Sequence, residues 1–379
     1  MNQGASNSDH PGAHLPRVAN VLVVRLSAMG DVIHTLPAVA ALRAAFPRAT
    51  IGWLIEERWA ELLCTLRYPR AGQRSAERPL VDRVHTVNLA EWRRDLLSFN
   101  TVQQVAVGLS ELRGVEYDAV VDFQGAVRSA LLARWSGAPI IYGDEQPREN
   151  AASMFYTKQV EGKGRHVVEQ ALSLARALAG ADAARMTSEE ASARVELPVD
   201  GDAEKKISAI TTEEFALLNP GAGWGAKQWP ADRYGAVARE LMHEGIRPLV
   251  NYGPGEEALA AAVEDASEGA ALRVSCSIAE LIALTRRARL MIGGDTGPLH
   301  LAAALQVPVV AIFGPTNPAR NGPVGTRSIV LRSPSSTTDH SRRREPEEGL
   351  LEIGVNEVTE AARTLLREGA RRTSGARGT

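Results

Sequence analysis

Apolar runs and segments of helical periodicity alternate along the first half of the chain. Residues 21–26, VLVVRL, form an apolar run typical of a strand buried on both faces of a parallel sheet. After the turn SAMGD, residues 31–47 place apolar side chains at helical spacing as far as Pro47. The same alternation continues to about residue 180, with further strand-like runs IGWLIEE, VHTVNL, YDAVVDF and PIIYG.

The alternation begins again in the second half, with strand-like runs FALLNPG, IRPLVNYG, LRVSC, RLMIGG and PVVAIFG separated by helical segments. Two such β/α series predict an α/β protein with two Rossmann-like, doubly wound domains facing across a cleft. Small and charged residues dominate between them and indicate a linker. The predicted parts are a disordered tail 1–17, a first domain 18–185, a linker 186–210, a second domain 211–368 and a disordered tail 369–379.

Composition narrows the class of protein. A chain of 379 residues with 44% hydrophobic and 23% charged residues suits two folded domains and excludes overall disorder. No apolar run approaches the ~18 residues of a membrane span. The net charge of -2 and the 5% aromatic content weigh against a nucleic-acid partner. Two cysteines, Cys64 and Cys276, exclude a disulfide framework and fit a reducing cytoplasm.

Several common catalytic motifs are missing, namely GxxxxGK[ST], HExxH, GxSxG and a GxGxxG after the first strand. The triplet Asp200-Gly201-Asp202 has the form that can hold a divalent metal on a sugar nucleotide. It lies in the polar linker, however, and we predict no metal site.

The turn after the first strand carries the first candidate, Asp31. Gly30 permits close backbone approach, and the helix dipole favours the ionised form of a carboxylate at the helix start. Such a carboxylate is a weak base, suited to a hydroxyl that loses its proton late. A simple helix cap remains the alternative for Asp31.

The loop after the first strand of the second domain carries the second candidate. Its three glycines, Gly221, Gly223 and Gly225, expose N–H groups suited to phosphate oxygens. Lys227 adds a positive charge suited to a diphosphate. The alternative is a flexible loop with a solvated lysine.

Two further turns follow later strands of the second domain. In GGDTGPLH, the N–H groups of Thr296 and Gly297 point at an anion beyond a helix start, and His300 lies one turn further on. Asp295 either joins this site or caps the helix. In YGPGEE, Glu256 or Glu257 is placed to bind ribose hydroxyls or only to start a helix.

The sequence resembles the ADP-heptose:lipopolysaccharide heptosyltransferases of glycosyltransferase family 9, more closely heptosyltransferase I than II. The resemblance runs from about residue 20 to 365. The matching stretches are RLSAMGDVIHTLPAVAAL, YDAVVDFQGAVRSALLAR, GDEQPRENAASMFY, KQWP and GGDTGPLHLAAALQVPVVAIFGPTNP. It implies a GT-B fold and an inverting transfer of heptose from ADP-heptose to Kdo of Kdo2-lipid A. No cofactor or metal is implied.

The resemblance also implies roles for individual residues. Asp31 is the implied general base. The implied donor-binding residues are Lys227, Asp295, Thr296, Gly297, His300, Glu256, Gly223 and Cys276. The implied acceptor-binding residues are Ser27, Met29, Gly30, Arg128 and Arg148, where guanidinium forks suit carboxylates and phosphates.

The sequence departs from the family at two places. The loop before Lys227 reads Gly-Ala-Gly-Trp-Gly where better-known members have hydroxyl residues, and Cys276 stands where some have Met. Alternatives therefore stay open: a family 9 transferase for another donor or acceptor, such as a heptosyltransferase II-like enzyme, a sugar-nucleotide epimerase, or a non-catalytic nucleotide-sugar binder. Residues 335–349 have no assigned role, and the sequence does not indicate an oligomeric state.

A lipid-linked acceptor implies peripheral contact with the cytoplasmic face of the inner membrane. A basic cluster either provides that contact or forms a solvated loop. Its members are Arg67, Arg70, Arg74 and Arg78.

Overall fold

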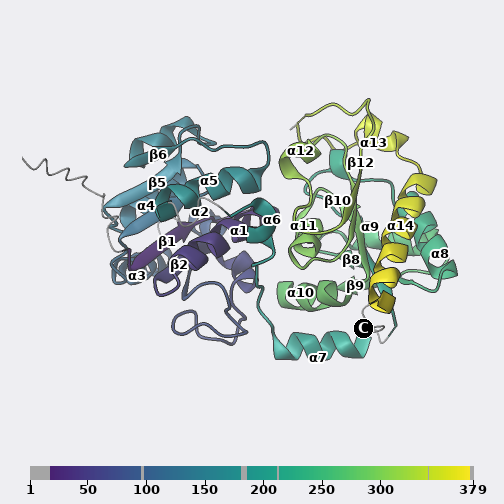
Figure 1. Ribbon diagram of the computed structural model, residues 1–379, viewed down its shortest axis with the longest axis horizontal. Coiled ribbons are helices and arrows are strands. Elements are labelled where there is room, and N and C mark those ends of the chain that lie inside the picture. Colours follow the sequence, from purple (N-terminus) through teal and green to yellow (C-terminus); the bar gives the residue numbers. More distant parts are fainter. Residues whose placement is uncertain (1–17, 95–97, 181–185, 211–212, 340, 376–379) are drawn as a thin grey trace, which may run out of the picture.

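The computed structural model contains two α/β domains side by side (Figure 1). It describes residues 18–375, except for 95–97, 181–185, 211–212 and 340. Within this described part, each domain is built on a six-stranded, all-parallel sheet with helices on both faces, so the predicted pair of doubly wound domains is confirmed. The predicted tail 1–17 lies outside the described residues.

The first sheet has the strand order β3-β2-β1-β4-β5-β6. Its strands are β1 (Asn20–Val24), β2 (Thr50–Glu56), β3 (Arg83–Val87), β4 (Ala119–Asp122), β5 (Ile140–Asp144) and β6 (Lys158–Val160). Its helices are α1 (Met29–Ala45), α2 (Leu89–Arg94), α3 (Phe99–Arg113), α4 (Val127–Trp135) and α5 (Val167–Ala179), with 3-10 turns η1 (Glu57–Leu62) and η2 (Asn150–Phe155). The central strand β1 is buried on both faces, which explains its apolar run.

The second sheet has the order β12-β11-β10-β7-β8-β9. Its strands are β7 (Phe215–Asn219), β8 (Arg247–Tyr252), β9 (Leu272–Ser275), β10 (Leu290–Gly294), β11 (Val309–Ile312) and β12 (Ser328–Leu331). Its helices are α8 (Ala231–His243), α9 (Glu257–Ala266), α10 (Ile278–Arg287), α11 (Gly297–Ala304), α12 (Pro318–Asn321), α13 (Glu348–Glu352) and α14 (Val355–Gly375), with a 3-10 turn η4 (Gly225–Lys227).

Each sheet reverses its strand order at its centre, and this reversal determines where ligands bind. In the first sheet the reversal lies between β1 and β4, and in the second between β7 and β10. Crossovers on opposite faces leave a crevice beyond the carboxyl ends of such strands. The turns after β1, β4, β7 and β10 therefore border the two crevices, and all the main candidate residues lie on these turns.

The two domains share one apolar core. A single cluster of buried side chains includes Leu36 from α1, Leu172 from α5 and Leu301 from α11. Helix α1 packs against α5 of its own domain and against α11 of the other. This packing fixes α1 and α11 relative to each other, and with them the turns at their N-termini.

Residues 186–210, predicted as a linker, contain two short helices, α6 (Ser188–Ser192) and α7 (Gly201–Ile210). Helix α6 packs against α1, and α7 packs against α10. Two ion pairs hold α7 there, Lys206 with Glu280 at 2.6 Å and Glu204 with Arg286 at 2.8 Å. The connection between the domains is therefore packed against both of them.

The predicted disordered tail from residue 369 is wrong for its first part, because α14 continues to Gly375. Residues 376–379 lie outside the described residues. None of the helices in the described ranges is both long enough and apolar enough to span a bilayer.

Candidate active site

Asp31 lies in the first turn of α1, where it caps the helix and stays accessible to solvent. Its Oδ2 accepts a hydrogen bond from the Ala28 N–H at 3.3 Å, and Ala28 itself has no side-chain oxygen to cap with. The carboxylate is 42% exposed and forms an ion pair with Arg25 at 3.0 Å. The two interpretations of Asp31 left open by the sequence are thus compatible, because the cap uses one hydrogen bond and leaves the group accessible.

Arg25 was not predicted as a site residue. Arg25 is the only charged residue in the apolar run VLVVRL, residues 21–26. A charge inside a buried run could have indicated a functional residue. Its guanidinium also donates to the carbonyl of Phe123, beyond the end of β4. Arg25 therefore connects the Asp31 turn to the turn on the other side of the first crevice.

The turn after β4 is docked rigidly on the Asp31 turn. Gln124 Oε1 accepts from the N–H groups of Leu26 and Ser27 at 3.1 and 3.3 Å. Asp122 holds the turn after β4 in place. Its carboxylate is buried and accepts hydrogen bonds from the Gln124 N–H and the Tyr156 hydroxyl, both at 2.9 Å. Burial raises the pKa of Asp122. Asp122 is therefore a structural carboxyl group with no exposure to the cleft.

The predicted acceptor residues Arg128 and Arg148 are brought to the same turn. Gly125 has a φ of +65°, and a Cβ at this glycine would lie 3.0 Å from the Arg148 backbone nitrogen. Val127, next to Arg128 at the start of α4, donates its N–H to the carboxylate of Glu149 at 2.8 Å. The two arginines thus border the first crevice from neighbouring segments.

In the second domain, Lys227, Asp295 and His300 form one buried polar cluster. Lys227 Nζ lies 2.7 Å from Asp295 Oδ2, and His300 Nε2 lies 2.9 Å from Asp295 Oδ1. Because a carboxylate only accepts, the His300 Nε2 atom carries the proton in this bond. Burial alone raises the pKa of Asp295, but the hydrogen bonds from His300 and Lys227 outweigh it and hold that pKa well below its usual range.

Thr296 and Gly297 start helix α11, as predicted. Thr296 is the N-cap residue, and its hydroxyl receives a hydrogen bond from the Asn219 amide at 3.4 Å. Asn219 ends β7, and its amide also donates to the Gly221 carbonyl at 3.0 Å. The loop after β7 and the helix start after β10 are therefore joined across the second crevice.

The remaining predicted donor residues line the same edge. The Glu256 carboxylate accepts a hydrogen bond from the Gly253 N–H at 2.9 Å. It also lies against Gly221 of the loop, since a Cβ added at Gly221 would come within 2.1 Å of Glu256 Oε1. Glu256, rather than the exposed Glu257, therefore reaches the loop. Cys276 follows β9, and burial raises the pKa of its thiol to about 11. Gly223 lies in open space within the loop.

The two crevices meet where α1 and α11 face each other with their N-termini. A Cβ on Gly297 would lie 2.6 Å from Met29 Sδ, and a Cβ on Gly30 would lie 3.0 Å from His300 Cδ2. Two glycines thus let the helix that carries Asp31 approach the helix that carries His300. This contact brings Met29, Gly30, Gly297 and His300 together at the boundary between the domains.

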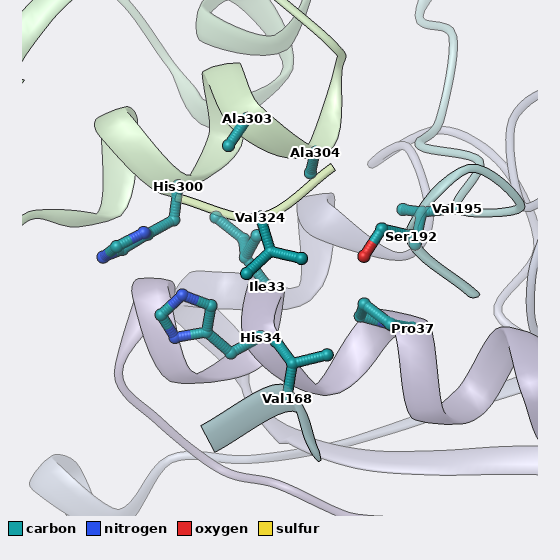
Figure 2. Close-up of a pocket in the computed structure, with 10 residues that line it drawn as sticks. All are labelled: Ile33, His34, Pro37, Val168, Ser192, Val195, His300, Ala303, Ala304 and Val324. Atoms are coloured by element: carbon teal, nitrogen blue, oxygen red, sulfur yellow. The ribbon is translucent and has the colours of Figure 1, made fainter. Parts of the chain in front are cut away.

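Histidine rings continue this contact beside the site (Figure 2). The His34 ring on α1 lies 4.1 Å from the His300 ring, centroid to centroid, and His166 bonds to the Gly322 carbonyl at 2.9 Å. Within the described residues, His34 Nε2 and His300 Nδ1 have no hydrogen-bond partner. They line a cavity of about 20 Å³ between the domains, room for about one water. Burial, with His300 and His166 nearby, holds the pKa of His34 well below its usual range.

The four arginines of the basic cluster at residues 67–78 have partners within the fold. Three of its members form ion pairs: Arg67 with Asp202, Arg70 with Glu57 and Arg74 with Asp82. The fourth, Arg78, is fully buried and donates to the Val81 carbonyl at 3.1 Å. The side chains of Arg67, Arg70 and Arg74 stay partly exposed in these ion pairs, and membrane contact through the cluster stays a prediction.

The Asp200-Gly201-Asp202 triplet also has structural roles. Asp200 Oδ1 accepts from the Asp202 and Ala203 N–H groups, both at 3.0 Å, at the start of α7. Across the described ranges, no group of three or more His, Cys, Asp or Glu side chains has the arrangement of a metal site.

Comparisons with known proteins identify the class. The model of glycosyltransferase family 9 (heptosyltransferase) matches residues 109–351. Lipopolysaccharide heptosyltransferase 1 of Pseudomonas aeruginosa is 31% identical over 83% of this chain and 83% of its own length. The structure of E. coli heptosyltransferase WaaC with ADP has a TM-score of 0.74 at 25% identity and covers 91% of this chain and 99% of its own. E. coli ADP-heptose lps heptosyltransferase II has a TM-score of 0.70 at 20% identity, covering 93% and 99%.

Two Rossmann-like domains that meet at a shared polar site form the GT-B fold, as predicted, and the matched heptosyltransferase structures share it. The chain belongs to glycosyltransferase family 9, the heptosyltransferases. The predicted resemblance is thereby confirmed, and family membership favours a transferase over the epimerase and the non-catalytic binder.

Proposed function

We propose that this enzyme transfers heptose from ADP-heptose to Kdo of the lipopolysaccharide inner core, with inversion and without a required metal. The observation that carries the proposal is the contact between α1 and α11. It places the accessible Asp31 carboxylate of one domain opposite the Lys227–Asp295–His300 cluster of the other. The names of the relatives, lipopolysaccharide heptosyltransferase 1 and heptosyltransferase WaaC with ADP, support a heptosyl donor that carries ADP and a lipopolysaccharide acceptor.

The donor nucleotide binds the second domain in this proposal. Its diphosphate lies on the N-terminus of α11, where the N–H groups of Thr296 and Gly297 and the helix dipole favour an anion. Lys227 contributes the adjacent positive charge. Glu256 and Cys276, at the ends of neighbouring strands, bind the nucleoside part.

Lys227 and the α11 N-terminus then stabilise the departing ADP as negative charge develops on it. This is electrostatic stabilisation of a leaving group by preorganised groups, a task that a metal ion performs in other enzymes. Lys227 donates a hydrogen bond to Asp295, and His300 donates to the other oxygen of the same carboxylate and so holds it in place. The position of Lys227 is thereby fixed, and little reorganisation is required during the reaction.

Asp31 takes the proton of the acceptor hydroxyl as the new bond to the anomeric carbon forms. Its ion pair with Arg25 keeps the carboxylate oriented toward the cleft. The acceptor lies on the first domain, where Arg128 and Arg148 face its carboxylates and phosphates. Attack from this face, opposite the departing ADP, inverts the anomeric centre.

A lipid-linked acceptor places the reaction at the cytoplasmic face of the inner membrane, through peripheral contact. In the basic cluster at residues 67–78, Arg67, Arg70 and Arg74 are ion-paired and partly exposed, and Arg78 is buried. We therefore assign the contact to the bound acceptor itself.

The test is ADP release by the purified protein with ADP-heptose and deacylated Kdo2-lipid A, in EDTA, with and without acceptor. Acceptor-dependent release is the expected result. Release that requires added Mg²⁺ would contradict the metal-free mechanism. Tight binding of ADP without turnover of ADP-heptose would support the nucleotide site but contradict the proposed substrates. The enzyme would then use another donor or acceptor within family 9, and the first acceptor to test is Kdo2-lipid A that already carries one heptose.

A further inference from the structure

The segment 341–347, SRRREPE, lies directly against the donor loop. The Ala226 N–H donates to the Arg343 carbonyl at 3.1 Å. A Cβ at Gly225 would lie 1.6 Å from the Arg344 carbonyl oxygen, so only glycine lets the two backbones approach this closely. The segment, to which the sequence alone assigns no role, is therefore part of the wall of the second crevice. We name it the arginine segment.

The arginine segment is anchored by its last residue. The buried Glu347 accepts from the Ser336 hydroxyl at 3.0 Å and from the Thr337 N–H at 3.1 Å. The Glu347 N–H in turn donates to the donor loop, at the Ala226 carbonyl, at 3.2 Å. Arg343 forms an ion pair with Asp339. These bonds give the segment a defined position relative to the loop.

Arg342 and Lys227 lie over the same indole ring. The Lys227 Nζ atom is 4.3 Å from the centroid of Trp224, and the Arg342 guanidinium carbon is 5.8 Å from it. Both distances are within the reach of cation–π attraction, ~6 Å. Unlike Arg343, Arg342 has no acidic partner among the residues that the structure describes. A guanidinium is thus held beside the donor lysine with its hydrogen-bond donors uncommitted.

We propose that Arg342 is a second cation for the diphosphate of the donor, acting with Lys227. The inference rests on the proposed function and extends it to a residue outside the matching motifs. Lys227 alone is poorly matched to a departing nucleoside diphosphate, because its charge is already compensated by Asp295 at 2.7 Å. The loop residues Gly221 to Gly225 provide no hydroxyl groups. A guanidinium fork supplies paired donors to phosphate oxygens at this position.

The Trp224 indole holds the Arg342 guanidinium near the donor site without occupying its hydrogen-bond donors. A cation–π contact at an exposed site is weak, whereas a hydrogen bond to a phosphate oxygen is charge-assisted and stronger. Arg342 therefore exchanges the Trp224 ring for the diphosphate when the donor binds. We assign Arg342 to the donor and not to the acceptor because the arginine segment bonds to the donor loop of the second domain.

The experiment is calorimetric titration of the full-length protein with ADP, AMP and adenosine in EDTA. The variants are Arg342→Ala, Arg342→Lys and, as the matched control, Arg344→Ala, which removes a neighbouring guanidinium that is not over the indole. We expect Arg342→Ala to weaken ADP binding about tenfold, AMP binding less, and adenosine binding not at all. Arg342→Lys restores part of the loss, and Arg344→Ala stays within about twofold of the unchanged protein.

Three outcomes would overturn the assignment: ADP binding unaffected by Arg342→Ala, an equal loss in Arg344→Ala, or an effect confined to the KM of the acceptor. In each of these the unchanged protein still binds ADP, so the proposed function stands while the inference fails. If the unchanged protein does not bind ADP, both fail.

A second variant removes the contact without removing a charge. Gly225→Ala forces the Arg344 carbonyl away from the loop and with it the arginine segment. ADP binding is expected to weaken, and adding Arg342→Ala is expected to cause no further loss, because both changes remove one interaction. Fully additive losses in the double variant would contradict the proposal.

Discussion

The two crevices are formed by sheets of the same topology, but their carboxylates differ in exposure and in the number of charged partners. In the first domain, the key carboxylate Asp31 is 42% exposed and has one arginine partner. In the second domain, the side chain of Asp295 is 7% exposed and is bonded to both a lysine and a histidine. An exposed carboxylate can accept a proton from a substrate, whereas a buried, doubly paired one serves to position its partners. Asp31 follows β1 and Asp295 follows β10, strands that each border the reversal of strand order in their sheet. The reversal point thus carries a reactive group in one domain and a binding group in the other.

Substitution of Asp31 tests this difference most strongly. Asp31→Ala is expected to lower the transfer rate about 10³-fold, because the acceptor hydroxyl loses its base, and to leave ADP affinity nearly unchanged. Asp31→Asn is expected to show the same loss. The measurements are acceptor-dependent ADP release and calorimetric ADP binding. Asp232→Asn, which removes another helix-start acid on α8, is the control. Loss of ADP binding together with activity would contradict the role given to Asp31.

Substitution of Lys227 is expected to give the reverse pattern. Lys227→Ala removes the cation from the diphosphate site and from Asp295, and should weaken ADP binding between about tenfold and a hundredfold, together with the rate. Adenosine binding should change little. Lys206→Ala, which breaks the exposed ion pair with Glu280, is the matched control and should change neither affinity. Equal effects of Lys227→Ala on ADP and adenosine would indicate a general loss of structure.

The acceptor face predicts a smaller effect. Arg148→Ala is expected to raise the KM for the deacylated acceptor about tenfold, because one guanidinium contact to an anionic group is lost, with ADP affinity unchanged. Arg134→Ala, at the exposed end of α4, is the control. A change in donor KM would instead place Arg148 on the donor side.

Substitution of His34 is expected to have the smallest effect, a change in how the free energy of unfolding depends on pH. Because the pKa of His34 is held well below its usual range in the fold, the unfolded chain binds a proton that the folded protein excludes below about pH 6.5. Stability is therefore lost as pH falls. His34→Phe keeps a ring beside His300 and should reduce the loss between pH 6.5 and 5.5 by about 1 kcal/mol. Thermal unfolding across this range, with the exposed His243→Gln as control, measures it.

The sequence predicted the two sheets and the positions of Asp31, Lys227 and Asp295 because these depend on local patterns. Buried parallel strands are apolar runs, and the turns that follow them hold the functional residues. Arg25, His34, Trp224 and Arg342 were missed because their roles come from contacts between distant segments. The ion pair of Arg67 in the basic cluster was missed for the same reason, since its partner Asp202 is distant in sequence. The helices of residues 186–210 are short and derive their stability from packing.

The apolar core that continues from α1 and α5 into α11 has a thermodynamic consequence. Domains that share little surface melt separately, whereas domains joined by a common core lose that core together. Unfolding of either domain here would expose apolar side chains of the other to water. We therefore expect a single calorimetric transition for the whole chain, whose calorimetric and van't Hoff enthalpies agree.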